Sequence, residues 1–573
     1  MYKPAPPRRK KTNIVRTQTG CKGCRKRRTK CDEQKPSCGT CARLGRPCER
    51  FSPKLEFRVL TSASAGNQRQ KAKKQSDHRH DPVSRLSPAL QPHRDPSQCV
   101  MFYKDVWRRQ CLPALNLVFQ QLDLNHQPAD LITEAIVALS ACWLSRSQPQ
   151  RKLFAVSGVA GLGVRPDSGH EAQSHEYYGA VMRKMATWSH EDFNARPTLA
   201  LAVLVLFCYL ESSMGNFKEF RVHSTGTRTL IRSYADWVVN EGSDILAAWV
   251  EIEMQNWWRR VYFSTPGFYR NSDSLLLQPR LDAVLETAKH NRAAVLLIMC
   301  ESHRLNNAAV ISSWEHYGGC SSDDLLSRSV DAVVWNTENN KSTPYECQIL
   351  LQGQSARLEQ WLALLPVTDL PDCWEDGREP ATAEQGMFNV RPLHFQSHRA
   401  AMNFSYYVTA RIMQCTEPLA SLDGTLHENI DAMYEESEAW VTILLRITAG
   451  IDWEDCTKLN AYTVGFASLL LACSLRSRRL ETGIWIQGWL EERLSKGNVY
   501  EEGNFPVFQV LEGLRLVNAE RRNGRDVFAM FQTVDDSGGN GKLGSYHSQM
   551  LVALQIYGRC RTSGTMYTYL RTV

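Results

Sequence analysis

Residues 21–48 read CKGCRKRRTKCDEQKPSCGTCARLGRPC and contain six of the 18 cysteines of this 573-residue chain. Their spacing repeats the pattern C-x2-C-x6-C twice, with six residues between the two copies. The other twelve cysteines are scattered over more than 450 residues and form no further CxxC pair. A tight cluster of cysteines favours metal binding, whereas isolated cysteines in a reducing compartment are usually small buried hydrophobic residues.

The repeat predicts a zinc centre. One zinc ion takes four tetrahedral ligands, so six thiolates satisfy one ion with two left over, or two ions when two sulfurs are shared. Because Cys21 and Cys38 are equivalent in the two copies, they are the natural bridging ligands. About 30 residues cannot build a hydrophobic core, so metal binding has to supply the free energy of folding.

Disulfide bonds and separate zinc sites fit these cysteines less well than a shared metal cluster. A disulfide framework suits a secreted domain, but the N-terminus MYKPAPPRRKK is not followed by the apolar segment of a secretory signal. Two independent zinc sites need eight ligands, and residues 21–48 contain six cysteines and no histidine. A shared cluster of six cysteines remains the best interpretation.

The two copies differ in charge. Five of the six residues from Arg25 to Lys30 are basic, against two of the six from Ala42 to Pro47. Taken alone, such a basic run is usually a nuclear import signal or a solvated surface. Here a predicted metal ligand stands at each end of it, which fixes its direction. The first copy is therefore expected to present a short cationic helix to duplex DNA, and the second to support it.

Residues 20–49 resemble the fungal binuclear zinc cluster (Zn2Cys6) DNA-binding domain of transcription factors. The resemblance covers the six cysteines, the basic run and Pro36 in the connecting loop. A weaker similarity, from Phe102 to about Ser233, is to the helical regulatory region that follows many such clusters. The resemblance implies two bound Zn2+ ions held by Cys21, Cys24, Cys31, Cys38, Cys41 and Cys48.

The resemblance also implies roles for the basic residues. Arg27 and Arg28 stand where the family places its main base-reading side chains, toward a CGG-type triplet. Phosphate contacts or orientation of the helix are then expected of Lys22, Arg25, Lys26 and Lys30.

The remaining sequence predicts a fold class: a small metal-stabilised Zn2Cys6 domain plus a large all-α regulatory domain, joined by a disordered linker. The linker is polar and basic and has few large apolar residues after Leu60. Apolar residues recur at helical spacing from Phe102 onward, as in Leu131–Leu144, Leu199–Leu210 and Phe395–Gln414, and are expected to form the core. The expected parts are a basic tail at 1–18, the zinc domain at 19–50, the linker at 51–97 and the regulatory domain at 98–573.

Two later segments carry separate predictions. Ile430–Trp440 mixes acidic and aromatic residues as activation segments do, but its apolar positions fit one face of a packed helix, which we favour. The sequence after Asn523, with a Gly-rich loop and then Tyr546–Tyr569, leaves its fold open.

The charge is unevenly distributed. Residues 1–97 carry 25 Lys and Arg against 7 Asp and Glu, a net +18, whereas the rest of the chain has a net charge of −10. This asymmetry predicts that the basic segment meets a polyanion while the acidic body stays soluble. The longest nearly pure apolar run has 12 residues, fewer than the roughly 18 that span a bilayer, so we expect a soluble intracellular protein without membrane contact.

No catalytic motif is apparent, and the protein is predicted not to be an enzyme. In His170-Glu171-Ala172-Gln173-Ser174-His175 the second histidine is one position too far along for an H-E-x-x-H zinc site. Gly538–Leu543 lacks the spacing of a phosphate-binding loop. An enzyme or scaffold that uses the cluster only structurally is the main alternative, and an RNA-binding role is a weaker one because the module lacks stacking aromatics.

Taken together, these features predict a nuclear, sequence-specific DNA-binding transcription factor that regulates genes transcribed by RNA polymerase II. Its partners are expected to be double-stranded DNA, a small-molecule effector and transcription coregulators. Many members of the family dimerise through a coiled coil after the cluster, and this chain has no apolar heptads there. It is expected to bind either as a monomer or as a homodimer formed by the helical body.

Overall fold

The computed structural model describes residues 21–26, 29, 31–32, 34, 37–46, 48, 96–121, 129–147, 152–155, 162–261, 274–317, 344–372, 390–423, 425, 427–496, 501–502, 505–532 and 553–572. The chain divides into two compact units, Met1–Thr61 and Ser62–Val573. The predicted tail at 1–18 lies outside the described residues, and so does the predicted linker up to residue 95.

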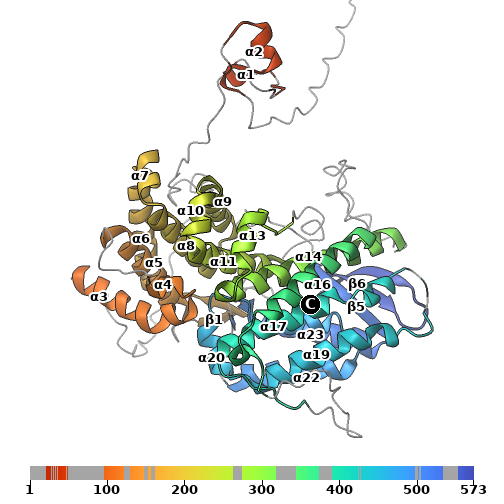
Figure 1. Ribbon diagram of the computed structural model, residues 1–573. Coiled ribbons are helices and arrows are strands. Elements are labelled where there is room, and N and C mark those ends of the chain that lie inside the picture. The colour runs from red at the N-terminus through yellow and green to blue at the C-terminus, as the bar shows by residue number, and fades with distance from the viewer. Residues whose placement is uncertain are drawn as a thin grey trace, which may run out of the picture. The chain divides into compact units, whose positions relative to one another are not determined.

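The N-terminal unit contains two short helices, α1 (Lys22–Lys26) and α2 (Gly39–Arg43), one in each copy of the cysteine repeat (Figure 1). Each helix begins directly after the first cysteine of its copy.

The second unit is mainly helical, as predicted (Figure 1). Its first half contains α3 (Pro96–Val106), a π-helical turn (Trp107–Cys111), a 3-10 turn (Leu112–Ala114), α4 (Val118–Gln121), α5 (Ala129–Ser147), α6 (Ser168–Ala186), α7 (His190–Ala195), α8 (Pro197–Met214), α9 (Phe217–Ser233), α10 (Ala235–Asn240) and α11 (Ser243–Val261). Its second half contains α13 (Pro279–Leu285), a 3-10 turn (Ala288–His290), α14 (Asn291–Tyr317), α16 (Pro344–Ala363), a 3-10 turn (Val367–Asp369), α17 (His398–Gln414), α18 (Glu417–Ala420), the 3-10 turn η7 (Ala432–Tyr434), α19 (Glu435–Gly450), α20 (Trp453–Leu459), α21 (Phe466–Ser474), α22 (Leu480–Lys496) and α23 (Val507–Arg522).

Helix α8 is a core helix whose ends follow from its sequence. Pro197 occupies the first turn, where its missing N–H costs no hydrogen bond. Gly215 ends the helix with φ 71°, a left-handed conformation that glycine adopts without strain. Among the described helices, α8 is the one long and apolar enough to cross a membrane, and 83% of it is buried inside the protein.

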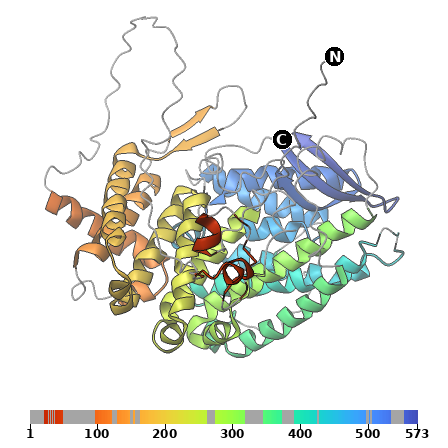
Figure 2. The ribbon, with the colours of Figure 1, turned by 90° about the horizontal axis from the view of Figure 1, so that it is seen from above.

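Helix α8 is the centre of one group of helices in this unit, and α11 connects that group to a second group around α14. Helices α5, α9 and α11 contact α8 directly, and α11 then contacts α14. Helix α14 also packs against α16 and α17, and α17 packs against α19. Figure 2 shows α3 to α6 at one end of this unit and the C-terminal strands at the other. The apolar stripes predicted from the sequence therefore face one another, as expected.

The segment after Asn523 forms an antiparallel sheet, β5 (Arg525–Gln532), β6 (Ala553–Cys560) and β7 (Met566–Thr572), in the order β5-β6-β7. The described residues also contain two small antiparallel pairs, β1 (Lys152–Ala155) with β2 (Leu162–Arg165), and β3 (Glu501–Glu502) with β4 (Phe505–Pro506). One apolar cluster joins the C-terminal sheet to α23, through Val527, Leu554, Ile556, Leu516 and Val517.

A buried arginine also attaches this sheet to the helices. Arg476, in the loop between α21 and α22, has only 4% of its surface exposed. Its guanidinium donates to Asn306 Oδ1 at 2.7 Å, Asn307 Oδ1 at 2.7 Å and the Phe528 carbonyl at 2.6 Å. The loop, α14 and β5 are thereby held together by one side chain.

Arg476→Ala is expected to lower the free energy of unfolding of this unit by about 3–5 kcal/mol, because it leaves three buried acceptors without their donor. Urea unfolding followed by tryptophan fluorescence measures this unit alone, since all 15 tryptophans follow residue 98. The matched control is Lys458→Ala, whose side chain is 64% exposed and pairs with Glu454, with an expected change below about 0.5 kcal/mol. Equal effects of the two substitutions would contradict the structural role of Arg476.

Candidate metal centre

The two copies of the cysteine repeat fold in the same way around their first cysteine. The backbone N–H of Cys24 donates to Cys21 Sγ at 3.4 Å, and that of Cys41 donates to Cys38 Sγ at 3.4 Å. Each of these sulfurs therefore accepts a hydrogen bond from the first turn of the helix that follows it. The Cys24 N–H lowers the pKa of Cys21, because a hydrogen bond to sulfur stabilises the thiolate.

The six sulfurs form two overlapping groups of four. The first consists of Cys21, Cys24, Cys31 and Cys38, and the second of Cys21, Cys38, Cys41 and Cys48. Within each group all Sγ atoms lie within 4.8 Å of one another. Cys21 and Cys38 belong to both groups, with their sulfurs 3.7 Å apart.

These distances fit tetrahedral zinc. A Zn–S bond of about 2.3 Å places the sulfurs of a regular tetrahedron about 3.8 Å apart. The Sγ atoms of Cys21 and Cys41 are 3.6 Å apart, as are those of Cys24 and Cys38. The donor set is all sulfur, which zinc accepts in structural sites. The residues present therefore fit a pair of zinc ions without a rearrangement of the chain.

The interior of this unit is made of cysteine. Its buried cluster consists of Cys21, Cys24, Cys31, Cys38 and Cys41, with Cys48 packed against it. A unit with no larger apolar core among its described residues needs another source of folding free energy, and metal–thiolate bonds supply it in small domains.

The predicted DNA-contacting residues are only partly described. Lys26 is exposed on α1, which also includes Lys22 and Arg25. Arg27, Arg28 and Lys30 lie outside the described residues, and so do the side chains of Lys22 and Arg25. The Thr29 N–H donates to the Cys24 carbonyl at 3.1 Å.

Asp32 is a structural residue of this unit that the sequence pattern did not reveal. Its two carboxylate oxygens accept from the Gly39 N–H at 3.1 and 3.0 Å, at the N-terminus of α2. A Cβ atom at Gly39 would lie 2.6 Å from Asp32 Oδ2, so a side chain at this position would displace the Asp32 carboxylate. The signal in the sequence was an acidic residue directly after a cysteine, but its partner seven residues away was not evident.

Asp32→Ala is expected to weaken zinc binding about fivefold, because loss of an acceptor at a helix N-terminus costs about 1 kcal/mol. Competition with a chromophoric chelator on the full-length protein measures the change. Asp32→Asn keeps one acceptor oxygen and is the matched control, with an expected loss of less than about twofold. Wild-type zinc affinity in the alanine variant would show that this contact does not stabilise the cluster.

Two histidines of the helical body, His170 of the excluded H-E-x-x-H motif and His398, each contact a neighbouring polar side chain. His170 lies 2.8 Å from the hydroxyl of Tyr103, and His398 lies 2.9 Å from Asn460 Oδ1. Within the part of the chain that the structure describes, the two cysteine groups are the only sets of three or more His, Cys, Asp or Glu side chains that could hold a metal.

Comparison with known proteins agrees with this geometry. The protein-family model of the fungal Zn(2)-Cys(6) binuclear cluster domain matches residues 19–56. The chain is 30% identical over 150 residues to sterol uptake control protein 2 of Candida albicans, which is 26% of this chain and 19% of that protein. It is 39% identical over 61 residues to a Zn(2)-C6 fungal-type transcription factor of Gibberella zeae, covering 10% of this chain and 12% of that protein.

A third relative is the lysine biosynthesis regulatory protein of Saccharomyces cerevisiae, 38% identical over 76 residues, which is 13% of this chain and 10% of that protein. The chain covers less than a fifth of the length of each of these three relatives. No solved structure matches the chain. The sulfur geometry and the family match lead to one conclusion: residues 19–56 form a fungal Zn(2)-Cys(6) binuclear cluster domain.

Proposed function

We propose that the protein is a sequence-specific DNA-binding transcription factor. It acts in the nucleus on genes transcribed by RNA polymerase II and is not an enzyme. The observation that carries this proposal is the pair of overlapping sulfur groups, because Cys24 and Cys31 of one group stand at the two ends of the basic segment 25–30. A cationic segment fixed at both ends presents its side chains in a defined direction, as recognition of a DNA groove requires.

In this proposal six cysteines hold two Zn2+ ions, with Cys21 and Cys38 as the shared ligands. Zinc supplies the bonds that stabilise the fold and takes no part in a reaction. The Cys24 and Cys41 N–H groups orient the two shared sulfurs and help to keep them as thiolates.

The basic residues then divide between phosphates and bases. Arg27 and Arg28 read a CGG-type triplet in the major groove, since arginine pairs with guanine O6 and N7 through two hydrogen bonds. Phosphate contacts are assigned to Lys22, Arg25, Lys26 and Lys30, and the exposed position of Lys26 on α1 suits that role. The +18 charge of residues 1–97 supports a polyanionic partner.

The helical body from about residue 98 is assigned a regulatory role, with a small-molecule effector and coregulators as its partners. Its net charge of −10 disfavours contact with DNA phosphates, which leaves DNA binding to the zinc domain. The linker at 51–97 has no heptad pattern, so the protein binds as a monomer or dimerises through the body.

The test of this function compares Arg28→Ala with Lys26→Ala in the full-length protein. On a CGG-containing duplex, loss of Arg28 is expected to cost about 1–3 kcal/mol, or roughly 5- to 150-fold in affinity. For a scrambled duplex, the same variant is expected to lose much less affinity relative to the wild-type protein. Lys26→Ala is expected to lower affinity for both duplexes equally, because a phosphate contact does not depend on the base sequence. Fluorescence anisotropy measures the affinity of each variant for each duplex. If Arg28→Ala lost the same affinity on both duplexes, Arg28 would be assigned to a phosphate contact and not to a base contact.

A further inference from the structure

The helical body contains a cavity of about 570 Å3 where η7, α19, α22 and the C-terminal sheet come together. This volume lies within the range of roughly 300–1,000 Å3 that is typical of small-molecule sites. Most of its lining is charged, and only three lining residues are uncharged: Ala432, Tyr434 and Leu480. The cavity therefore suits a polar ligand.

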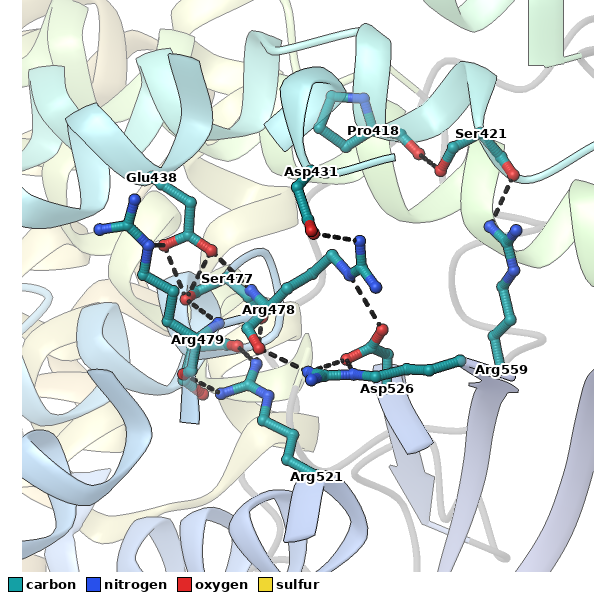
Figure 3. Close-up of polar contacts among 12 residues, drawn as sticks. Pro418, Ser421, Asp431, Glu438, Ser477, Arg478, Arg479, Arg521, Asp526 and Arg559 are labelled. Atoms are coloured by element: carbon teal, nitrogen blue, oxygen red, sulfur yellow. Dashed lines mark hydrogen bonds and ion pairs between the residues drawn. The ribbon is translucent and has the colours of Figure 1, made fainter. Parts of the chain in front are cut away.

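The cavity has an acidic side and a basic side. Asp431 directly precedes η7, and Glu435 and Glu438 lie in the first turn of α19. Arg478 and Arg479 come from the loop before α22, and Arg561 follows β6. Figure 3 shows Asp431 and Glu438 on one side, with Arg478 and Arg479 extending toward them from the other.

The basic side is held in place by buried hydrogen bonds. Arg521 donates to the carbonyls of Ser474, Ser477 and Arg479, so one side chain holds the end of α21 and two residues of the loop. Figure 3 shows Arg521 extending toward Ser477 and Arg479. Arg561 donates to the Arg478 carbonyl and to Asp526 Oδ1. The cations at the cavity therefore stand on a fixed backbone, which lowers the entropic cost of binding.

One residue of the acidic side, Glu438, is fixed in the same way. Glu438 is buried, and its oxygens accept from the Ser477 hydroxyl at 2.9 and 3.0 Å and from the Arg478 N–H at 2.7 Å. Arg478 bridges the two sides, since it contacts Asp431 at 2.7 Å and Asp526 at 3.1 Å. Its guanidinium also lies 5.4 Å from the centre of the Tyr434 ring.

Arg479 is the least engaged cation of the lining. Its side chain is 52% exposed, and its Nε lies 4.0 Å from Glu438 Oε2, the outer limit of an ion pair. The next two residues, Leu480 and Glu481, also line the cavity and begin α22, whose N-terminal N–H groups carry partial positive charge. An anionic group at this point meets the Arg479 guanidinium and a helix N-terminus, with the exposed Glu481 carboxylate beside them.

We propose that this cavity binds a small zwitterion, namely an α-amino acid. Its carboxylate lies against Arg479 and the start of α22, and its ammonium group lies toward Glu435, because the neighbouring Asp431 is already paired with Arg478.

Most charged residues of the lining already engage partners within the protein, namely Arg478, Asp431, Arg561 and Glu438. The remaining charged residues of the lining are Arg479, Glu435 and Glu481, whose side chains are exposed. A zwitterion offers a charge to each sign among them, whereas a simple anion or a simple cation offers a charge to only one. The site goes beyond DNA recognition, and its occupancy can be measured independently of DNA binding.

The test is isothermal titration calorimetry of the full-length, zinc-loaded protein with each of the protein amino acids in turn. At least one is expected to bind with a single saturable site. For the tightest of them, the N-acetyl derivative removes the ammonium group and the amide removes the carboxylate. Each is expected to bind at least about tenfold more weakly, because each leaves charged lining residues unpaired.

Two substitutions test the location. Arg479→Gln and Glu435→Gln change exposed side chains on opposite sides of the cavity, and each is expected to weaken binding about tenfold or more. Arg515→Gln, 45% exposed on α23 and outside the cavity lining, is the matched control and is expected to leave affinity unchanged. The proposal is overturned if no amino acid binds, if the N-acetyl derivative or the amide binds as tightly as its parent, or if Arg479→Gln has no effect.

Discussion

Replacing Cys38 with serine is expected to remove both zinc ions and to lower affinity for duplex DNA by more than about 100-fold. Cys38 belongs to both groups of four sulfurs, so each metal position loses a ligand at once. A serine hydroxyl is not ionised at neutral pH and is a poor replacement for a thiolate. Because binding of structural zinc contributes about 10–16 kcal/mol to folding, the domain then loses its main source of stability.

Two further substitutions make this prediction specific. Cys48→Ser affects one group only and leaves Cys21, Cys24, Cys31 and Cys38 complete, so it is expected to retain about one zinc ion. Cys560→Ser changes a partly exposed cysteine of the body and is expected to keep the full zinc content. Metal analysis by inductively coupled plasma mass spectrometry checks all three. Identical zinc content in the Cys38 and Cys48 variants would argue against shared sulfurs.

The second large effect is expected from salt. If about four of the six basic residues from Lys22 to Lys30 neutralise phosphates, the slope of log affinity against log salt is about −3.6. Affinity for any duplex is then expected to fall roughly 150-fold between 50 and 200 mM salt, because bound counterions are released from the DNA. Anisotropy titrations across a salt series measure the slope.

The variant Lys26→Ala provides the control for this slope. Removing one phosphate contact is expected to make the slope shallower by about 0.9. A wild-type slope near zero would contradict the proposed interface, because it would mean that phosphate charge contributes nothing to binding.

Much of the fold could be predicted from the sequence, because long apolar stripes specify buried helices. Leu199–Leu210 lies within α8, and Pro197 and Gly215 mark its ends. Ile430–Trp440, which we interpreted as a packed helix, contains η7 and the start of α19, with Tyr434 and Trp440 buried. In such segments the apolar positions in the sequence are also the buried positions of the helix, so the local pattern is sufficient to predict the helix.

The C-terminal sheet could not be predicted in this way. Its strands β5 and β6 are separated by twenty residues along the chain, so no short turn in the sequence indicates that these two strands pair. The loop between α21 and α22 is another such case. Its sequence SLRSRR resembles a solvated basic turn, yet Arg476 is buried, because its acceptors come from α14 and β5.

The metal centre was almost fully predictable, since cysteine spacing constrains which sulfurs can meet. The structure adds the backbone N–H bonds to Cys21 and Cys38 and the contact between Asp32 and Gly39. These contacts depend on the path of the folded chain, which spacing alone does not specify. The proposed amino-acid cavity could not be predicted either, because its charged residues come from three separate segments of the chain, 431–438, 478–481 and Arg561.

The central claim is that metal bonds among six sulfurs hold the basic segment in a shape that recognises duplex DNA. Native mass spectrometry of the full-length protein, paired with duplex binding before and after treatment with a zinc chelator, tests it most directly. The account predicts two zinc ions per chain and a parallel loss of zinc and DNA affinity, both restored by added zinc. A zinc-free protein that binds the CGG duplex as tightly as the loaded one would contradict it.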